Sequence, residues 1–236
     1  DFEANINEQP KPEKLNDFEA GIEQKKSNYS WTVNLYYMLY QDQLVLTGKI
    51  NDVGAYTRTN IPNSYRAGIE LQGGVKINKW LAVSANTTLS ENKIKNYTEF
   101  IDDYDNGGQV TNFYAKTDIA FSPSVIGAAT VNITPLKNLE IDLYSKYVGY
   151  QYLDNSSMKS RSLDAFFTQD IRLAYTLSYK KIKAVNFFMQ VNNIFNATYE
   201  PNGYTFSYIY GGQTTTENYF FPMAGTNWMA GINIKL

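Results

Sequence analysis

The feature that most constrains this chain is an alternation of apolar and polar residues with a period of two, repeated along most of its length. In the segment Trp31–Leu39 every second residue is large and apolar, and in Tyr65–Ile77 every second residue is apolar or glycine. Successive side chains of a β-strand point to opposite faces, whereas an amphipathic helix repeats every 3.6 residues. The period therefore predicts strands that each have one apolar face.

The alternation predicts nine strands, and most of them are long. Strands of globular proteins usually have about five or six residues, whereas most of these run to roughly 12 to 20. The predicted strands are residues 15–26, 29–46, 63–78, 79–97, 114–134, 138–152, 162–179, 183–195 and 218–236.

Charged residues are absent from one face of these nine strands. Every second residue of 18–22, 31–39, 65–77, 81–89, 119–133, 139–147, 165–177, 185–191 and 228–236 gives 49 positions, none of which is Asp, Glu, Lys or Arg. These four types make up 19% of the chain. A β-sandwich and a membrane barrel both keep charge off one face, so the alternation leaves both architectures open.

The connections between the predicted strands alternate in length. Segments 27–28, 78–79, 135–137 and 180–182 are short, and 47–62, 98–113, 153–161 and 196–217 are longer. Bacterial outer-membrane barrels have tight turns at one end and long loops at the other. The 36 aromatic residues, many of them near strand ends, also suit the interfacial girdles of such barrels. The sequence therefore favours an all-β fold, a transmembrane antiparallel β-barrel, over a sandwich.

The number of strands predicts that this barrel is not closed by these residues alone. Bacterial single-chain barrels have an even number of strands, and lipid does not tolerate open strand edges. Nine strands would leave two edges unpaired. We expect residues 1–236 to be the C-terminal portion of a larger barrel.

Composition excludes several kinds of chemistry. The chain has no Cys and no His, which removes disulfides, the usual zinc and haem ligands, and Ser–His or Cys–His nucleophilic pairs. With 21 basic and 23 acidic residues it lacks the charge of a nucleic-acid binder. We expect no enzyme activity, no cofactor, no metal site and no nucleic-acid partner.

Several segments in order resemble the C-terminal half of a TonB-dependent outer-membrane receptor, siderophore-receptor-like and of the Bacteroidetes type. The resemblance is carried by four stretches and covers nearly the whole chain. They are Pro10–Gly21, with its Lys-Pro-Glu entry into a strand; Tyr37–Val45 followed by Asn60–Glu70; Val191–Asn196, with its Asn-Asn-Ile-Phe end; and Phe221–Leu236. The closing residue is Leu236, where the family usually has an aromatic residue.

The resemblance implies fold, location and partners. It implies the last nine strands of a 22-stranded barrel in the outer membrane of a Gram-negative bacterium, with the plug domain and upstream strands not present here. Such receptors import a scarce ligand, here a ferric siderophore or other iron complex, and take energy from the TonB–ExbB–ExbD complex. Outer-membrane lipid and a possible surface lipoprotein are further implied partners. A SusC-like glycan or nutrient importer and a passive porin-type barrel are the alternatives.

The candidate ligand-binding residues lie in the long loops and the upper part of the predicted lumen. Guanidinium groups suit anionic oxygen ligands, and aromatic rings offer stacking surfaces. The candidates are Tyr56, Arg58, Arg66, Tyr104, Tyr204, Phe206, Tyr208 and Tyr210.

Each candidate has a structural alternative. The tyrosines could belong to a strand that continues beyond the membrane, and Arg66 could pair with Glu70 two residues along, as Arg172 could with Asp170. The acidic run at 102–105 does not match the EF-hand spacing. We expect that run to be a solvated loop.

Overall fold

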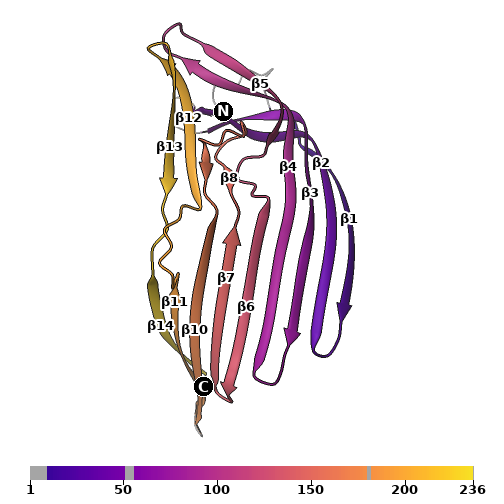
Figure 1. The fold of residues 1–236 in the computed structure, drawn as a ribbon, viewed down its shortest axis with the longest axis vertical. Coiled ribbons are helices and arrows are strands. Elements are labelled where there is room, and N and C mark those ends of the chain that lie inside the picture. The colour runs from indigo at the N-terminus through magenta and orange to yellow at the C-terminus, as the bar shows by residue number, and fades with distance from the viewer. Residues whose placement is uncertain (1–9, 51–55, 180–181, 236) are drawn as a thin grey trace.

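The computed structural model describes residues 10–50, 56–179 and 182–235, and these residues form strands joined by turns and loops (Figure 1). None of the described residues belongs to a helix with the length and apolarity needed to cross a membrane. The strands are β1 (Lys14–Lys25), β2 (Tyr29–Ile50), β3 (Tyr56–Lys76), β4 (Leu81–Asp103), β5 (Gln109–Asp118), β6 (Val125–Leu136), β7 (Leu139–Val148), β8 (Gln151–Tyr152), β9 (Ser162–Leu163), β10 (Phe166–Tyr179), β11 (Ile182–Asn192), β12 (Asn202–Tyr210), β13 (Gln213–Phe221) and β14 (Asn227–Lys235).

Nine of these strands form one curved antiparallel wall. Its order is β1-β2-β3-β4-β6-β7-β10-β11-β14, so each strand pairs with its neighbours along the chain once the loop strands are set aside. Within the described residues, β1 pairs only with β2, and β14 pairs only with β11. The number of wall strands and the antiparallel sheet predicted from the sequence are confirmed, whereas the bounds of several predicted strands are not.

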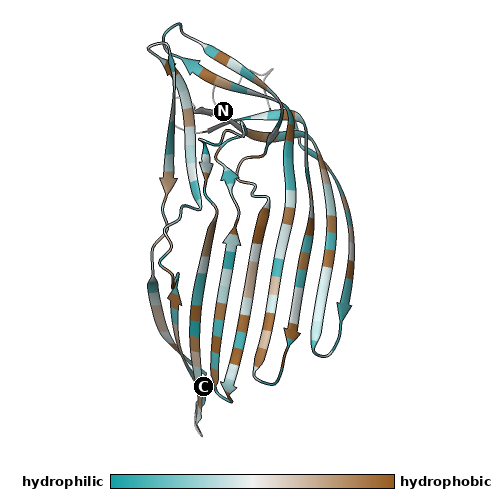
Figure 2. Cartoon of the chain, viewed as in Figure 1, coloured by the Kyte–Doolittle hydropathy of each residue, from teal (hydrophilic) through white to brown (hydrophobic). Residues whose placement is uncertain are grey.

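Hydrophilic and hydrophobic residues alternate along the wall strands (Figure 2), so the two faces of the wall differ in chemistry. One face exposes large apolar side chains, including Phe18 at 60%, Leu35 at 52% and Ile232 at 61%. A continuous exposed apolar face of this size is foreign to the surface of a soluble monomer. It is the surface expected of a barrel wall that contacts lipid.

The opposite face is polar and is linked across strands by hydrogen bonds. Asp142 of β7 accepts hydrogen bonds from the Asn132 amide at 2.6 Å and the Tyr144 hydroxyl at 3.1 Å. Its carboxylate also pairs with the Arg172 guanidinium at 3.3 Å. The pairing of Arg172 with Asp170 considered from the sequence is therefore wrong, because strand pairing places Asp142 directly opposite Arg172.

The predicted strand 114–134 is wrong, because the chain bends between β5 and β6. Both strands pair with β4. Strand β5 pairs with residues 93–102 of β4, and strand β6 pairs with residues 81–89. At the bend Phe121 has a positive φ of 52°, a conformation that interrupts a strand. Ile119 is buried and Phe121 lies with polar-face residues, so their assignment to the apolar face is also wrong.

The predicted loop 196–217 and strand 218–236 are also wrong. The β12–β13 hairpin spans residues 202–221 and so crosses the predicted boundary, and β14 is a separate strand. Gly211 and Gly212 at the hairpin tip have φ of 62° and 72°, which suits the two-residue turns that match strand twist. Pro222 follows β13 and cannot donate to a ladder.

Several other strands and connections differ in length from the prediction. Strands β2 to β5 continue past the predicted ends, so the connections 47–62 and 98–113 contain less loop than expected. The predicted strands 138–152 and 162–179 are shortened to β7 and β10, and the small β8–β9 pair lies between them. The described tight turns 26–28, 77–80 and 137–138 lie at one end of the wall, and the long connections lie at the other (Figure 1). These two ends are called the turn end and the loop end below.

Replacing Leu35 on the apolar face with Lys should destabilise the protein in a bilayer. A lysine facing lipid near the bilayer centre costs about 2 to 4 kcal/mol. The matched control is Asn34→Lys, because Asn34 lies on the polar face and donates to Glu19 and Glu70. Urea unfolding in phospholipid vesicles, followed by tryptophan fluorescence, measures both variants. Equal destabilisation by the two lysines would contradict the assignment of the faces.

Candidate functional site

Three segments pack together at the loop end and form what we call the loop-end cap. They are the outer part of the β4–β5 hairpin (residues 93–118), the loop of residues 149–165, and the β12–β13 hairpin (residues 202–221). Figure 1 shows the two hairpins rising beyond the ends of the wall strands. Residues far apart in the sequence therefore meet at this end of the wall.

The tips of the two hairpins are joined by backbone groups and one carboxylate. Asp105 accepts hydrogen bonds from the backbone N–H groups of Gly211 and Gly212 at 2.8 and 2.7 Å. Consecutive N–H groups in a left-handed turn form an anion-binding concavity. The Tyr104 N–H donates to the Ile209 carbonyl at 3.0 Å. Short parallel pairing of β12 with β4 extends this contact.

A buried ion cluster holds the loop 149–165 against β4. The Arg161 guanidinium binds Glu99 of β4 and Asp154 of the loop, the latter at 2.8 Å. The three side chains are between 3% and 9% exposed. Burial favours a lower pKa for Arg161, but the charges of Asp154 and Glu99 outweigh it and raise that pKa. A buried pair of this kind is costly to break, because removal of one partner leaves an uncompensated charge.

Tyr114 completes the cluster from β5. Its hydroxyl donates to Glu99 at 3.0 Å. Burial raises the pKa of Tyr114 to about 12, and the negative charge of Glu99 adds to the effect. The tyrosine therefore stays neutral and remains a donor throughout the physiological pH range.

The loop 149–165 also contacts the other parts of the cap. Asn155 accepts a hydrogen bond from the Ala120 N–H at 2.8 Å, which ties the loop to the bend after β5. The Asn218 amide of β13 donates to the Ser160 carbonyl at 2.8 Å. The loop thus links both hairpins, and the cap is one packed unit.

One face of the β12–β13 hairpin is a row of stacked rings. The rings of Tyr204 and Tyr219 lie 4.8 Å apart and nearly parallel, and Phe206 continues the row at 6.0 Å from Tyr219. Tyr219 and Tyr208 donate to Glu217 and lower the pKa of its carboxyl. This interaction is complete near neutral pH and is lost as the pH falls through the lowered pKa.

A cavity of about 480 Å³ lies where the cap meets the wall. It combines one cation with apolar and aromatic groups from distant parts of the chain. Its lining residues are Arg58, Phe121, Leu153, Asn202, Gly203, Tyr204 and Phe221. The structure therefore brings together two of the candidate residues, Arg58 from β3 and Tyr204 from β12.

Arg66 lines a separate depression of about 350 Å³ on the polar face. Its guanidinium donates to Asn92 at 3.2 Å and to the Ser122 hydroxyl at 2.9 Å. The ion pair of Arg66 with Glu70 considered from the sequence is therefore wrong, because Arg66 binds these two partners instead. Phe121 lines this depression as well as the cavity with Arg58.

The remaining candidates occupy different places in the cap. Tyr104 and Tyr210 lie at the hairpin tips and are 67% and 69% exposed. The Tyr104 ring lies 5.8 Å from that of Tyr208. Tyr56 begins β3, but its side chain lies outside the described part of the structure. A role in ligand binding stays a prediction for every one of the eight candidate residues.

The acidic run at 102–105 has a structural role. Asp103 accepts hydrogen bonds from the Asn106 amide at 3.0 Å and from the Asp105 N–H at 3.0 Å. The hydrogen bonds from Asn106 lower the pKa of Asp103. Asp102 accepts from the Gln109 amide at 2.7 Å. The three carboxylates thus hold the hairpin tip in shape.

Sequence reasoning missed the ion cluster and the position of Phe121. Glu99 and Arg161 are 62 positions apart, and no periodic pattern connects them. Phe121 fits an apolar alternation that runs straight through the bend. The one local signal of an interruption is Pro123, two residues further on.

A two-faced antiparallel wall with tight turns at one end and packed loops at the other is the architecture of outer-membrane β-barrels. The match to a family model is consistent with this. The chain belongs to the TonB dependent receptor-like, beta-barrel family, whose model matches residues 3–194. Members of this family are outer-membrane receptors and transporters of Gram-negative bacteria, not enzymes.

Solved structures share the fold at low sequence identity. The siderophore receptor PiuA from Acinetobacter baumannii is 17% identical with a TM-score of 0.71, and the match covers 98% of this chain and 30% of PiuA. The ferric-catecholate import receptor Fiu from E. coli K12, in its closed form, is 15% identical with a TM-score of 0.63, and the match covers 95% of this chain and 28% of Fiu. The copper transporter OprC is 15% identical with a TM-score of 0.65, and the match covers 97% of this chain and 32% of OprC.

The chain therefore spans about a third or less of the length of these three proteins. Comparison with the sequences of curated proteins gives no significant match.

Replacing Asp105 with Ala should release the two hairpin tips from each other. The variant loses both hydrogen bonds to the Gly211 and Gly212 N–H groups, so we expect hydrogen exchange of these amides to accelerate roughly tenfold or more. Asp102→Ala is the control, because its carboxylate accepts only within its own hairpin. Unchanged exchange in Asp105→Ala would show that the tips are held by other contacts.

Replacing Arg161 with Gln should loosen the whole loop-end cap. Glu99 and Asp154 would be left without their cation, which costs about 3 to 5 kcal/mol. Hydrogen exchange should therefore increase in the loop 149–165 and the outer β4–β5 hairpin together. Lys116→Gln is the control, because it removes the exposed bridge to Glu91 and a contact with the Tyr65 ring but no part of the buried cluster, and it should leave exchange unchanged. Increased exchange confined to the loop alone would contradict a single packed cap.

Proposed function

We propose that this chain forms part of the wall and the ligand-facing loops of an outer-membrane importer for a scarce ligand, an iron complex. In this proposal it supplies the C-terminal nine strands of a 22-stranded barrel, and import takes energy through TonB, ExbB and ExbD. The observation that carries the proposal is the cavity at the loop end, which combines Arg58 with the rings of Tyr204 and Phe221.

The charge of Arg58 is available to a ligand. Arg66, Arg161 and Arg172 each have protein partners, whereas in the described part of the chain Arg58 makes no ion pair and its side chain is exposed. A guanidinium binds carboxylate or catecholate oxygens through two parallel donors. An anionic complex with aromatic groups would satisfy both the cation and the ring surfaces of this cavity.

The similar structures support iron over glycans. PiuA is described as a siderophore receptor and Fiu as a ferric-catecholate import receptor, whereas OprC is described as a copper transporter. The cavity is better suited to an anion than to a free metal cation, because its one charged lining residue is itself a cation. A SusC-like glycan importer and a passive porin remain as outcomes of the test.

Binding of a ferric complex should depend on the two sides of the cavity. We expect Arg58→Ala and Tyr204→Ala each to weaken binding of a ferric catecholate about tenfold or more, through lost charge and lost ring contact. Phe113→Ala is the control, since this exposed ring of β5 lies outside the cavity. Calorimetry with purified receptor, using a ferric catecholate, a ferric hydroxamate, cupric ion and a maltooligosaccharide, measures the preference.

Uptake in cells separates the alternatives. Transport of radiolabelled iron by the intact receptor should stop in a strain without TonB. Persistent uptake in that strain would indicate a passive porin. Binding of the maltooligosaccharide but of no ferric complex would indicate a glycan importer.

A further inference from the structure

The turn end of the wall carries many exposed lysines, and of the acidic residues only Glu23 and Glu140 lie within three residues of the described turns. The described turns 26–28, 77–80 and 137–138 contain Lys26, Lys79 and Lys137, and none contains Asp or Glu. Between β10 and β11 the sequence is Lys180-Lys181. Four further lysines lie near these turns: Lys25, Lys76, Lys183 and Lys235.

These lysines differ from the arginines of the chain. Arg66, Arg161 and Arg172 have protein partners away from the turns. The turn-end lysines described by the structure are exposed, and none of them forms an ion pair with another described residue. Lysine is a flexible point charge that binds anions without a fixed geometry.

Large apolar side chains lie directly beside the turn lysines. Lys79 stands between Ile77 and Trp80, which are 57% and 49% exposed, and Lys137 follows Leu136, which is 64% exposed. A tryptophan beside a lysine suits the level of lipid headgroups, where the ring contacts apolar chains and the ammonium reaches outward. Each of these turns therefore combines an apolar anchor with a cation.

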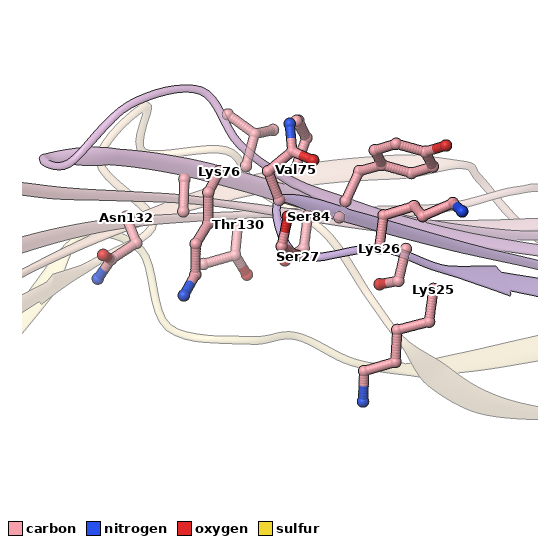
Figure 3. Close-up of a pocket in the computed structure, with 14 residues that line it drawn as sticks. Lys25, Lys26, Ser27, Val75, Lys76, Ser84, Thr130 and Asn132 are labelled. Carbon is pink, nitrogen blue, oxygen red and sulfur yellow. The ribbon is translucent and has the colours of Figure 1, made fainter.

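Lysines at the turn end extend to both sides of the wall. Figure 3 shows Lys25 and Lys76 on the same side of the sheet as Thr130 and Asn132, which belong to the polar face. Lys26 extends to the side of Val75, which belongs to the apolar face. Lys25, Lys26 and Lys76 all line one depression of about 360 Å³ beside this turn. Lys25 and Lys76 therefore differ from Lys26 in the side to which they extend, although the three line the same depression.

We propose that the turn lysines, Lys26, Lys79 and Lys137, bind the phosphate groups of anionic phospholipids in the leaflet that the turns reach. The inference rests on the proposed function for the placement of the wall in a membrane. The cations occur at successive turns along the wall instead of gathering at one spot. Headgroups meet the wall all along its rim, whereas a partner protein would contact one patch. The charge and the spacing therefore fit lipid better than a polypeptide.

The test uses the intact receptor in nanodiscs of phosphatidylcholine with a minor fraction of phosphatidylglycerol. Native mass spectrometry counts the phosphatidylglycerol molecules retained by the protein. We expect the double variant Lys79→Gln/Lys137→Gln to retain severalfold fewer than the unchanged receptor. The matched control, Lys25→Gln/Lys76→Gln, removes the same charge from the polar face and should retain the same number.

Three results would overturn the inference. They are equal retention in the turn variant and the unchanged receptor with import intact, equal retention with import lost, which would indicate a polypeptide partner, and equal loss of lipid in both double variants. Insertion and iron uptake are measured on the same samples. A receptor that inserts and imports without preference for phosphatidylglycerol refutes only the lipid inference, whereas failure to insert refutes the proposed function itself.

Discussion

The exclusion of charge from one face of the wall is the constraint on which the rest of the structure depends. An apolar face can be left exposed only if its environment is apolar, and in such an environment every backbone N–H and C=O must be paired within the protein. Long neighbouring strands with tight turns meet this demand. Polar side chains then have only the opposite face and the strand ends left to occupy, and the hydrogen-bonded residues around Asp142 lie there.

The wall strands could be predicted because their signal is local. A period of two needs only neighbouring residues to be recognised, and it located all nine wall strands. It failed where the chain leaves the wall. At Phe121 the chain changes direction with a positive φ, although the apolar alternation around it is unbroken. The β12–β13 hairpin, which turns at Gly211 and Gly212, lies largely in a segment predicted as a loop. The same limit explains Arg66, whose partners come from β4 and the bend at Ser122, which strand pairing and not sequence distance brings near.

The candidate site was predictable in its parts but not in its assembly. Arginine and tyrosine in long loops pointed to ligand contact, and Arg58 and Tyr204 do line one cavity. Their proximity depends on the packing of the cap, which the buried cluster of Arg161, Glu99 and Asp154 holds together. Such a cluster has no local signature, since each member taken alone resembles an ordinary loop charge.

The cavity and the cap are therefore energetically linked. Leu153 and Tyr204 in the cavity wall belong to the cap, whereas Arg58 comes from β3 and Phe121 from the bend after β5. A ligand that contacts both sides must bind the arrangement in which the cap is docked, because only that arrangement brings the two sides together. Its measured affinity then includes the free energy of docking the cap. Under the proposed function, residues that never touch the ligand, such as Arg161, would therefore influence binding through the population of the docked state.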